Sequence, residues 1–504
     1  MTVKTVQKPA VGAALVVGGG IAGMQSALDL ANAGYLVHLV TESSSIGGRM
    51  AQLDKTFPTN ECAMCMLGPR MTDTFNHPNI RLHTCSYLEK VEGEKGHFTV
   101  QIKERARYVD IEECTACGEC EKVCPVTVPN EYNEGAGTRK AIHKMFPQAV
   151  PNKYLITKRG TPPCRSACPA GTNAQGYIAL IAQGKFAEAL EVIHRRLPFA
   201  GICGRICHHP CESECNRAQY DDPIAIATLK RAAFDFGWEG AAAQAKKSPK
   251  QTTTKEEKVA IIGAGPAGLT AAQDLALAGY QVTVYDALNK PGGMLRGGIP
   301  RYRLPLEVVE RETERILNLG VNFIGNTVVG KDITLAEIQQ QYQAVILAIG
   351  LQQSRRLKIE GDNLRGILPG ISFLRQSSLG NPPQIGKKVV VIGGGNVAID
   401  VARSARRLGA TEVHLACLET RAEMPAHSWE IEEALEEGII LHNSWGPRRF
   451  LGNGDQVSGV ELMQCTQVFD ADKNFAPRYN QQVLKTLAAD TVILAIGQEA
   501  DLSL

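Results

Sequence analysis

The chain has 504 residues and a formal net charge of +2, with 44% hydrophobic and 6% aromatic residues. This balance excludes a basic surface for nucleic acid, and the lack of any apolar run of about 18 residues excludes a membrane-spanning helix. Residues 1–11 carry no apolar secretory core, so we expect a cytoplasmic protein of about three or four domains.

Three stretches read as a strand, a glycine turn, a helix and a second strand. In this order the segments are 14–17, 18–23, 24–32 and 36–40; 258–262, 263–268, 269–277 and 281–285; and 388–392, 393–398, 399–408 and 412–416. Their runs of β-branched residues are typical of strands buried on both faces of a parallel sheet. We therefore predict an α/β fold with three Rossmann-like βαβ units.

Two later segments are nearly identical, namely Ala344-Val-Ile-Leu-Ala-Ile-Gly350 and Thr491-Val-Ile-Leu-Ala-Ile-Gly497. Each predicts a late strand of its own sheet, so the second and third units form whole domains. No counterpart lies between Arg49 and Lys258. The first unit is therefore expected to form only part of a dinucleotide domain.

Each glycine turn is a candidate pyrophosphate site, because backbone N–H groups and the helix dipole there favour an anion. A lone Gly-x-Gly-x-x-Gly is often only a tight turn. Here an acid follows each turn at roughly 20 residues, where a ribose hydroxyl is bound. These acids are Glu42, Asp286 and Glu419. Ala398 replaces the last glycine of the third turn, a substitution that the fingerprint allows.

Most of the fifteen cysteines fall in three groups, which favours metal ligands in a reducing compartment. The ferredoxin spacing Cys-x-x-Cys-x-x-Cys-x-x-x-Cys-Pro is formed by Cys114, Cys117, Cys120 and Cys124. This run is typical of a [4Fe–4S] cluster rather than zinc. Cys62 and Cys65 either complete a cluster or are two packed thiols.

A second set of six thiols consists of Cys164, Cys168, Cys203, Cys207, Cys211 and Cys215. They close one cubane and begin a second, or close two with a ligand such as His208 or His209. We expect at least one [4Fe–4S] cluster here. Residues 174–197 predict two amphipathic helices beside these thiols. The isolated Cys85, Cys417 and Cys465 read as inert, partly buried thiols.

Residues 14–157 resemble the A-type polypeptide of heterodisulfide reductase. The motifs that carry the resemblance are residues 47–60, Cys62-x-x-Cys65, residues 107–110, the ferredoxin run and residues 146–151. The resemblance implies iron–sulfur clusters beside a flavin. It places that flavin near Gly18, Gly20, Gly23, Glu42 and Arg49.

Residues from about 161 to the end are similar to the small subunit of glutamate synthase and its relatives. The motifs are 291–294, 296–300, 303–305, 393–400 and 423–426. The resemblance implies FAD- and NAD(P)H-binding domains of the glutathione/thioredoxin reductase type, a ferredoxin-like segment and an α-helical iron–sulfur domain. For FAD it implies Gly263, Gly265, Gly268, Asp286, Gly292, Gly293, Arg303 and Gly350. For the nicotinamide nucleotide it implies Gly393, Gly395, Asn396, Ala398, Glu419 and Arg421.

The expected domains follow from the motifs. They are a partial FAD-binding domain (1–108), a ferredoxin-like segment (109–157), an α-helical iron–sulfur domain (158–240), a linker (241–257), an FAD-binding domain (258–384), an NAD(H)-binding domain (385–485) and the truncated start of a returning FAD segment (486–504).

The sequence departs from the glutamate synthase family at three places. Residues 153–163 lack the family's additional Cys-x-x-Cys, and the Gly-Asp segment expected after Gly497 is not part of the sequence. Leu418 and Glu419 replace the arginine pair of members that use NADPH. Glu419 would repel a 2′-phosphate, which favours NADH over NADPH, although Arg421 lies nearby.

Together these features predict an FAD- and iron–sulfur-dependent NAD(P)H oxidoreductase subunit. It would pass electrons between NADH and the [4Fe–4S] clusters of a heterodisulfide-reductase-like complex, with ferredoxin, hydrogenase or dehydrogenase subunits as alternative partners. Cofactors carry this chemistry, so no catalytic acid, base or nucleophile is expected. Two alternatives are a non-catalytic electron-wiring component and a glutamate synthase small subunit.

Overall fold

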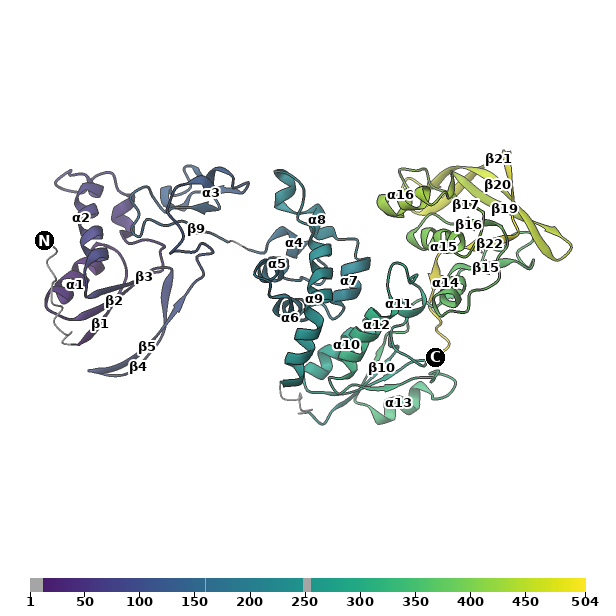
Figure 1. Ribbon diagram of the computed structural model, residues 1–504, viewed down its shortest axis with the longest axis horizontal. Helices are drawn as coiled ribbons and strands as arrows, with labels where there is room; N and C mark the ends of the chain where they lie inside the picture. Colours follow the sequence, from purple (N-terminus) through teal and green to yellow (C-terminus); the bar gives the residue numbers. More distant parts are fainter. Residues whose placement is uncertain (1–11, 159, 248–254) are drawn as a thin grey trace. The chain divides into compact units, whose positions relative to one another are not determined.

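The computed structural model describes residues 12–158, 160–247 and 255–504 (Figure 1). The chain divides into two compact units. Unit 1 comprises residues 1–163 with 214–224, and unit 2 comprises 164–213 with 225–504. No helix among the described residues is both long and apolar enough to cross a membrane.

Unit 1 begins with the first predicted βαβ unit. Its parallel sheet has the order β1-β2-β3, with β1 (Ala13–Val17), β2 (Leu36–Val40) and β3 (Ile80–His83). The helical elements are α1 (Ile21–Asn32), η1 (Gly48–Gln52) and α2 (Ala63–Asn76). Met24, Leu39, Leu67 and Phe146 are part of one buried core, which ties α1, α2 and the sheet to the ferredoxin-like segment.

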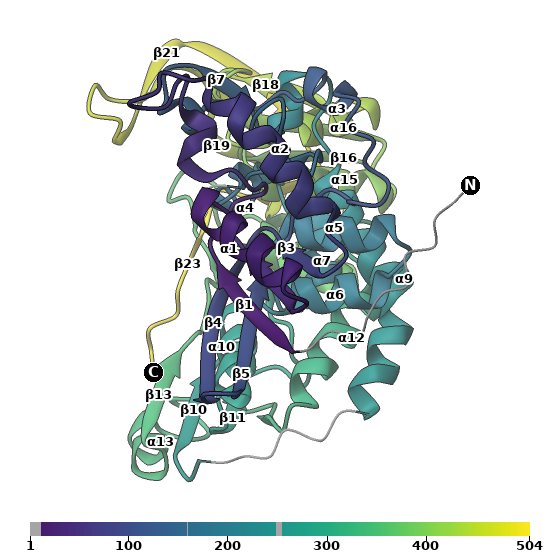
Figure 2. The same ribbon diagram turned by 90° about the vertical axis from the view of Figure 1, so that its left-hand side faces the viewer.

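The rest of unit 1 is built from short hairpins. β4 (Ser86–Glu94) and β5 (His97–Glu104) form a long antiparallel pair, seen side by side in Figure 2. The smaller elements are α3 (Glu119–Lys122), β6 (Thr127–Pro129), η2 (Glu131–Asn133), β7 (Thr138–Lys140), β8 (Ile142–His143), β9 (Leu155–Ile156) and η3 (Asn216–Gln219). Such short elements leave most cysteines of this segment on loops.

Unit 2 opens with an all-helical region. Its helices are α4 (Pro163–Ser166), α5 (Ala174–Ala182), α6 (Phe186–His194), α7 (Ala200–Ile206), α8 (Pro210–Ser213) and α9 (Ile226–Lys247). The two amphipathic helices predicted within 174–197 are α5 and α6. Helix α9 continues to Lys247, so the first part of the predicted linker 241–257 is helical. Residues 248–254 of that linker lie outside the described residues.

The flavin-type domain of unit 2 contains the second βαβ unit. Its parallel sheet has the order β12-β11-β10-β13. The strands are β10 (Lys258–Ile262), β11 (Gln281–Tyr285), β12 (Asn322–Ile324) and β13 (Ala344–Leu347). The helices are α10 (Pro266–Leu277), α11 (Met294–Gly297), α12 (Leu306–Leu317) and α13 (Leu335–Gln341).

The nicotinamide-type domain contains the third unit in a parallel sheet of order β15-β22-β16-β17-β18. The strands are β15 (Ile367–Pro369), β16 (Lys388–Ile392), β17 (Glu412–Cys417), β18 (Ile440–Asn443) and β22 (Thr491–Leu494), and the helices are α14 (Gly370–Ser378), α15 (Asn396–Arg407) and α16 (Ser428–Glu436). A three-stranded antiparallel sheet is added by β19 (Trp445–Asn453), β20 (Gln456–Phe469) and β21 (Phe475–Ala488).

Two expected boundaries move in this domain. β15 pairs with β22, so the domain begins near Ile367 rather than at 385. β22 also pairs with β16, so residues 491–494 belong to this sheet and not to a returning flavin segment. β14 (Gln353–Ser354), which precedes β15, pairs antiparallel with β23 (Gln498–Glu499), which follows β22. The chain thus enters and leaves the domain along one short pair of strands.

Candidate cofactor and electron-transfer sites

The three glycine turns have nearly the same geometry. A Cβ at Gly268 would lie 1.9 Å from the Gly263 carbonyl oxygen, and one at Gly23 would lie 1.8 Å from that of Gly18. These positions admit only glycine, because helix and strand approach too closely there. In the third turn Ala398 is accommodated, with its Cβ 3.5 Å from a Cβ placed on Gly393.

The middle glycine of each turn faces open space. A Cβ at Gly20, Gly265 or Gly395 would meet nothing within 4 Å. Each of them precedes the first residue of a helix, where free N–H groups favour an anion. An open cradle at this point suits the pyrophosphate of a dinucleotide, so the residues present fit FAD and a nicotinamide nucleotide.

The acids that follow the turns are held in different ways. Asp286 accepts from the Ala264 N–H at 2.6 Å, which places its carboxylate at the flavin-type turn. A Cβ at Gly394 would lie 2.8 Å from Oε2 of Glu419, so this carboxylate covers the nicotinamide-type turn. Glu42 instead pairs with Arg105 at 3.0 Å on the surface of unit 1.

A second glycine loop closes on each flavin-type turn. A Cβ at Gly293, where φ is +52°, would lie 2.9 Å from the Gly265 Cα. Gly48, where φ is +54°, has the same relation to Gly20 in unit 1. The repeated approach shows that units 1 and 2 build the same cradle from different sequences.

Unit 1 has a cavity of about 470 Å³ beside its cradle. Gly48 and Arg49 line it, together with Tyr132 and Phe146. The Arg49 guanidinium is paired with Glu134 at 2.5 Å across exposed surface. Arg49 thus lies at a cavity large enough for a flat ring system, and its contact with a flavin stays a prediction.

Arg303, which the resemblance assigns to FAD, is held by two acidic side chains of the nicotinamide-type domain. Its guanidinium donates to Asp400 of α15 at 2.7 and 2.8 Å and to Glu430 of α16 at 2.5 Å. Burial raises the pKa of Asp400 to about 6, while Arg303 opposes that rise. The three side chains join the two nucleotide domains of unit 2. Asp400 ends the motif 393–400, whereas no motif marks Glu430.

Four rings stack between the helical region and the nicotinamide-type domain. His208 stacks on His427 at 5.5 Å between ring centroids, His427 on Trp429 at 4.5 Å, and Trp429 on His209 at 5.0 Å. The backbone N–H of His427 also donates to Asn396 at 2.9 Å, which links the stack to the nucleotide turn. A cavity of about 270 Å³ lies among these side chains.

The thiols of unit 1 are free and largely accessible. Cys62 precedes α2 and accepts a hydrogen bond from the Cys65 N–H at 3.3 Å. A side-chain hydrogen bond with Cys65 lowers the pKa of Cys62. Cys117 and Cys120 are exposed, while Cys114 and Cys124 are half-buried.

The thiols of the helical region lie on or beside short helices. Cys203 lies on α7, and burial raises its pKa to about 12; burial raises the pKa of Cys211 to about 11. Cys164, Cys168 and Cys207 are half-buried. Cys215 is also half-buried and belongs to unit 1. Over the described ranges, no three His, Cys, Asp or Glu side chains converge closely enough to hold one ion. The ligand sets therefore remain predictions.

Glu312, which the sequence did not single out, connects the flavin-type domain to helix α7. It lies on α12, is fully buried, and accepts from the Gly201 and Ile202 N–H groups at 2.8 and 3.0 Å. Burial raises the pKa of Glu312 to about 7. The carboxylate caps the helix that carries Cys203, so it fixes this thiol relative to the flavin-type domain.

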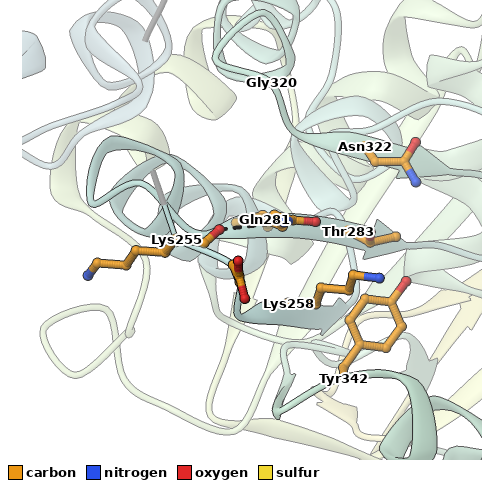
Figure 3. Close-up of a pocket in the computed structure, with 9 residues that line it drawn as sticks. Lys255, Lys258, Gln281, Thr283, Gly320, Asn322 and Tyr342 are labelled. Carbon is orange, nitrogen blue, oxygen red and sulfur yellow. Dashed lines mark hydrogen bonds between the residues drawn. The ribbon is translucent and has the colours of Figure 1, made fainter. Parts of the chain in front are cut away.

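The cavity in Figure 3 lies at the opposite edge of the flavin-type sheet. It has a volume of about 580 Å³ and is lined by Lys258, Gln281 and Asn322, the first residues of β10, β11 and β12. Ligands of open parallel sheets bind at the carboxyl ends of the strands, where the glycine turns are. This cavity is therefore not the cofactor site.

Comparisons with known proteins agree with this arrangement. Residues 257–504 match the pyridine nucleotide-disulphide oxidoreductase family, residues 157–242 match the dihydropyrimidine dehydrogenase domain II 4Fe-4S cluster family, and residues 107–128 match a 4Fe-4S binding domain. The matches assign both iron–sulfur regions and the FAD-type region independently of the geometry.

Three relatives extend the comparison. The NADPH-Fe(3+) oxidoreductase subunit beta of Geobacter sulfurreducens is 41% identical over 362 residues, which are 70% of this chain and 53% of the relative. The chain thus spans about half the length of that relative. An A-type iron–sulfur polypeptide of the CoB–CoM heterodisulfide reductase of Methanopyrus kandleri is 54% identical over 155 residues, 31% of this chain and 24% of the relative.

The glutamate synthase (NADPH) small chain of Azospirillum brasilense is 34% identical over 360 residues, which cover 68% of this chain and 73% of that protein. Both resemblances expected from the sequence are confirmed, as is the α/β fold with FAD- and NAD(P)-binding domains of the thioredoxin reductase type. The chain belongs to the family of the glutamate synthase small chain and is an FAD- and iron–sulfur-containing oxidoreductase subunit.

Proposed function

We propose that this chain passes electrons between NADH and the [4Fe–4S] clusters of a heterodisulfide-reductase-like complex. The observation that carries the proposal is the connection of three regions within unit 2. Arg303 joins the flavin-type to the nicotinamide-type domain, and Glu312 joins the flavin-type domain to the cluster-bearing helix α7. A flavin would supply the conversion between two-electron hydride transfer and one-electron transfer.

The chain's own residues position these groups. The turn at Gly265 presents helix N–H groups to a pyrophosphate, and Asp286 holds that turn through Ala264. The Gly395 turn does the same for the nicotinamide nucleotide. Glu312 keeps α7 fixed, so electrons have a constant distance to cross.

The preference for NADH rests on Glu419. Its carboxylate covers the nicotinamide-type turn and would accept from a ribose 2′-hydroxyl. Two unit charges about 4 Å apart repel by roughly 1–4 kcal/mol in partly wet surroundings, which disfavours a 2′-phosphate. The names of the relatives from Geobacter and Azospirillum include NADPH. A preference for NADH would therefore distinguish this chain from them.

A second candidate is the small-chain role in glutamate synthesis, which the extent of the Azospirillum match favours. The two functions differ in the partner. A heterodisulfide-reductase-like protein bound to the purified chain would support the first, and a glutamate synthase large chain would support the second.

Anaerobic titration of the cluster-reconstituted chain with NADH, and separately with NADPH, tests the proposal. Bleaching of the flavin absorbance by NADH at much lower concentration than by NADPH is the expected result. An equal response to both nucleotides would contradict the role of Glu419 and leave the oxidoreductase standing. If flavin neither copurifies nor rebinds, the chain is an electron-wiring component instead.

A further inference from the structure

The two complete dinucleotide domains show what closes a sheet of this kind. In the flavin-type domain β13 pairs in parallel with β10, and in the nicotinamide-type domain β22 pairs in parallel with β16. The two late strands have the nearly identical sequences Ala-Val-Ile-Leu and Thr-Val-Ile-Leu. Both end against the glycine turn.

The contact with the turn is the same in both domains. A Cβ at Gly263 would lie 2.2 Å from the Ala348 carbonyl oxygen, and one at Gly393 would lie 2.3 Å from that of Ala495. The residue after each late strand also donates a backbone hydrogen bond to the last residue of the first strand. The Ala348 N–H donates to the Ile262 carbonyl at 2.8 Å, and the Ala495 N–H donates to the Ile392 carbonyl at 2.8 Å.

Unit 1 has the same turn without this contact. Gly18 has φ of +113°, close to the +109° of Gly263, yet a Cβ placed on it would meet nothing within 4 Å. Among the described residues β1 pairs only with β2. Val17 is 58% exposed, whereas the equivalent Ile262 is 5% exposed and Ile392 is 3% exposed.

The hydrogen-bonding pattern identifies which backbone groups of β1 face its open edge. The Gly18 N–H donates to Val40 of β2, and bonding alternates along a strand. The N–H and C=O groups of Ala13, Leu15 and Val17 therefore point away from β2. The flavin-type domain shows the same orientation. There the carbonyl of Ile262, the counterpart of Val17, accepts a hydrogen bond from the Ala348 N–H that follows β13.

We propose that the free edge of β1 takes a parallel strand from a partner chain. The strand would carry a short run of β-branched or aliphatic residues followed by Ala-x-Gly, as β13 and β22 do. Main-chain hydrogen bonds would supply the affinity, as in other strand-addition interfaces. Pairing would also bury Val17 and complete the wall of the cradle at Gly18.

Among the described residues, a second copy of this chain offers no unpaired strand of this sequence. Its two segments of the required sequence, β13 and β22, already pair inside their own sheets. The Geobacter and Methanopyrus relatives are subunits of larger assemblies by name, which favours a different partner chain. The proposal concerns unit 1 alone and does not depend on nucleotide oxidation in unit 2.

Hydrogen–deuterium exchange of the full chain tests the proposal without any redox chemistry. The probe is a synthetic peptide of residues 344–350 flanked by lysines, and the control is the same peptide with prolines at its second and third positions, which removes two donors. The reference segments are 258–262 and 388–392 for closed strands, and 80–83 for an ordinary edge strand.

Without peptide, residues 13–17 are expected to exchange faster than both closed strands. The probe should then slow their exchange at least about tenfold, which corresponds to about 1.4 kcal/mol of protection. The proline peptide should have no effect, and neither peptide should protect 80–83. Slow exchange of 13–17 in the chain alone would overturn the proposal, because the edge would already be covered, and so would failure of the probe to protect.

Discussion

Arg303 donates to both carboxylate oxygens of Asp400, and this pair joins the flavin-type domain to the nicotinamide-type domain. Asp400 is 7% exposed and Glu430, the second acceptor, is 5% exposed. Burial raises the pKa of both carboxyl groups, and Arg303 opposes that rise. One guanidinium therefore stabilises two buried carboxylates at a domain boundary.

Replacing Arg303 by Met should destabilise the chain strongly near neutral pH. The two acids would keep their burial and lose their counter-charge, and breaking a buried pair in this way costs about 3–5 kcal/mol. Their pKa values would rise further above those of the unfolded chain. Stability from such groups is present at low pH and is lost as the pH rises, so the penalty should grow between about pH 5 and 8.

Urea unfolding at several pH values measures this penalty. Glu432→Gln, an exposed change on the same helix as Glu430, is the matched control and should leave stability unchanged. A penalty for Arg303→Met that does not vary with pH would contradict the role assigned to the ion pair.

Glu312 predicts a second pH dependence, with a defined window. Its pKa is raised from 4.5 to about 7 because it is buried, so the folded chain holds a proton that the unfolded chain releases. The free energy of unfolding should therefore fall by on the order of 3 kcal/mol as the pH rises from about 4.5 to 7. Glu312→Gln should remove this slope.

Chemical unfolding of the two proteins across the window gives the comparison. Glu314→Gln changes an exposed residue of the same helix and should keep the wild-type slope. If the Glu312→Gln protein shows the wild-type slope, another group is responsible for it.

Alanine substitutions at two glycines of the flavin-type turn should have different effects, one on flavin affinity and the other on the stability of the fold. Gly265→Ala adds a methyl group into open space, at a φ of −78° that alanine adopts readily. The protein should fold normally and lose flavin affinity, because the methyl group occupies the pyrophosphate cradle. Gly268→Ala should instead destabilise the domain, since its Cβ would meet the Gly263 carbonyl at 1.9 Å.

Flavin content after reconstitution and the melting temperature distinguish the two effects. Retention of full flavin content by the Gly265→Ala protein would show that no pyrophosphate lies at this turn.

Glu419→Gln should weaken the discrimination against NADPH. Removing one charge about 4 Å from a 2′-phosphate relieves roughly 1–4 kcal/mol of repulsion, a gain of about fivefold to a thousandfold in NADPH affinity relative to NADH. Nucleotide titrations of flavin absorbance measure the ratio. Glu436→Gln, an exposed change on α16, should leave the ratio as it is. An unchanged ratio in the Glu419→Gln protein would show that another residue selects the nucleotide.

The three βαβ units were predictable nearly to the residue, because each depends on local signals. Strands buried on both faces leave continuous apolar runs, and the turns leave glycines at fixed spacing. The repeated strand sequence likewise identified β13 and β22. It did not give the boundary at Ile367, since the pairing of β15 with β22 joins residues more than a hundred positions apart.

The end of α9 was missed although its signal was present. Residues 241–247 are mostly alanine, glutamine and lysine, which favour helix even without an apolar period. Glu312, Asp400 and Glu430 could not be predicted in the same way. A charged residue on an amphipathic helix normally faces water, and their partners lie 97 to 127 residues away.

The stack of His208, His427, Trp429 and His209 connects the segment of the predicted cluster thiols to the nucleotide turn. Residues 207–211 carry two of those thiols as well as both histidines. Because the His427 N–H also donates to Asn396 at the nucleotide turn, a displacement of residues 207–211 would be transmitted to that turn through two aromatic contacts and one hydrogen bond.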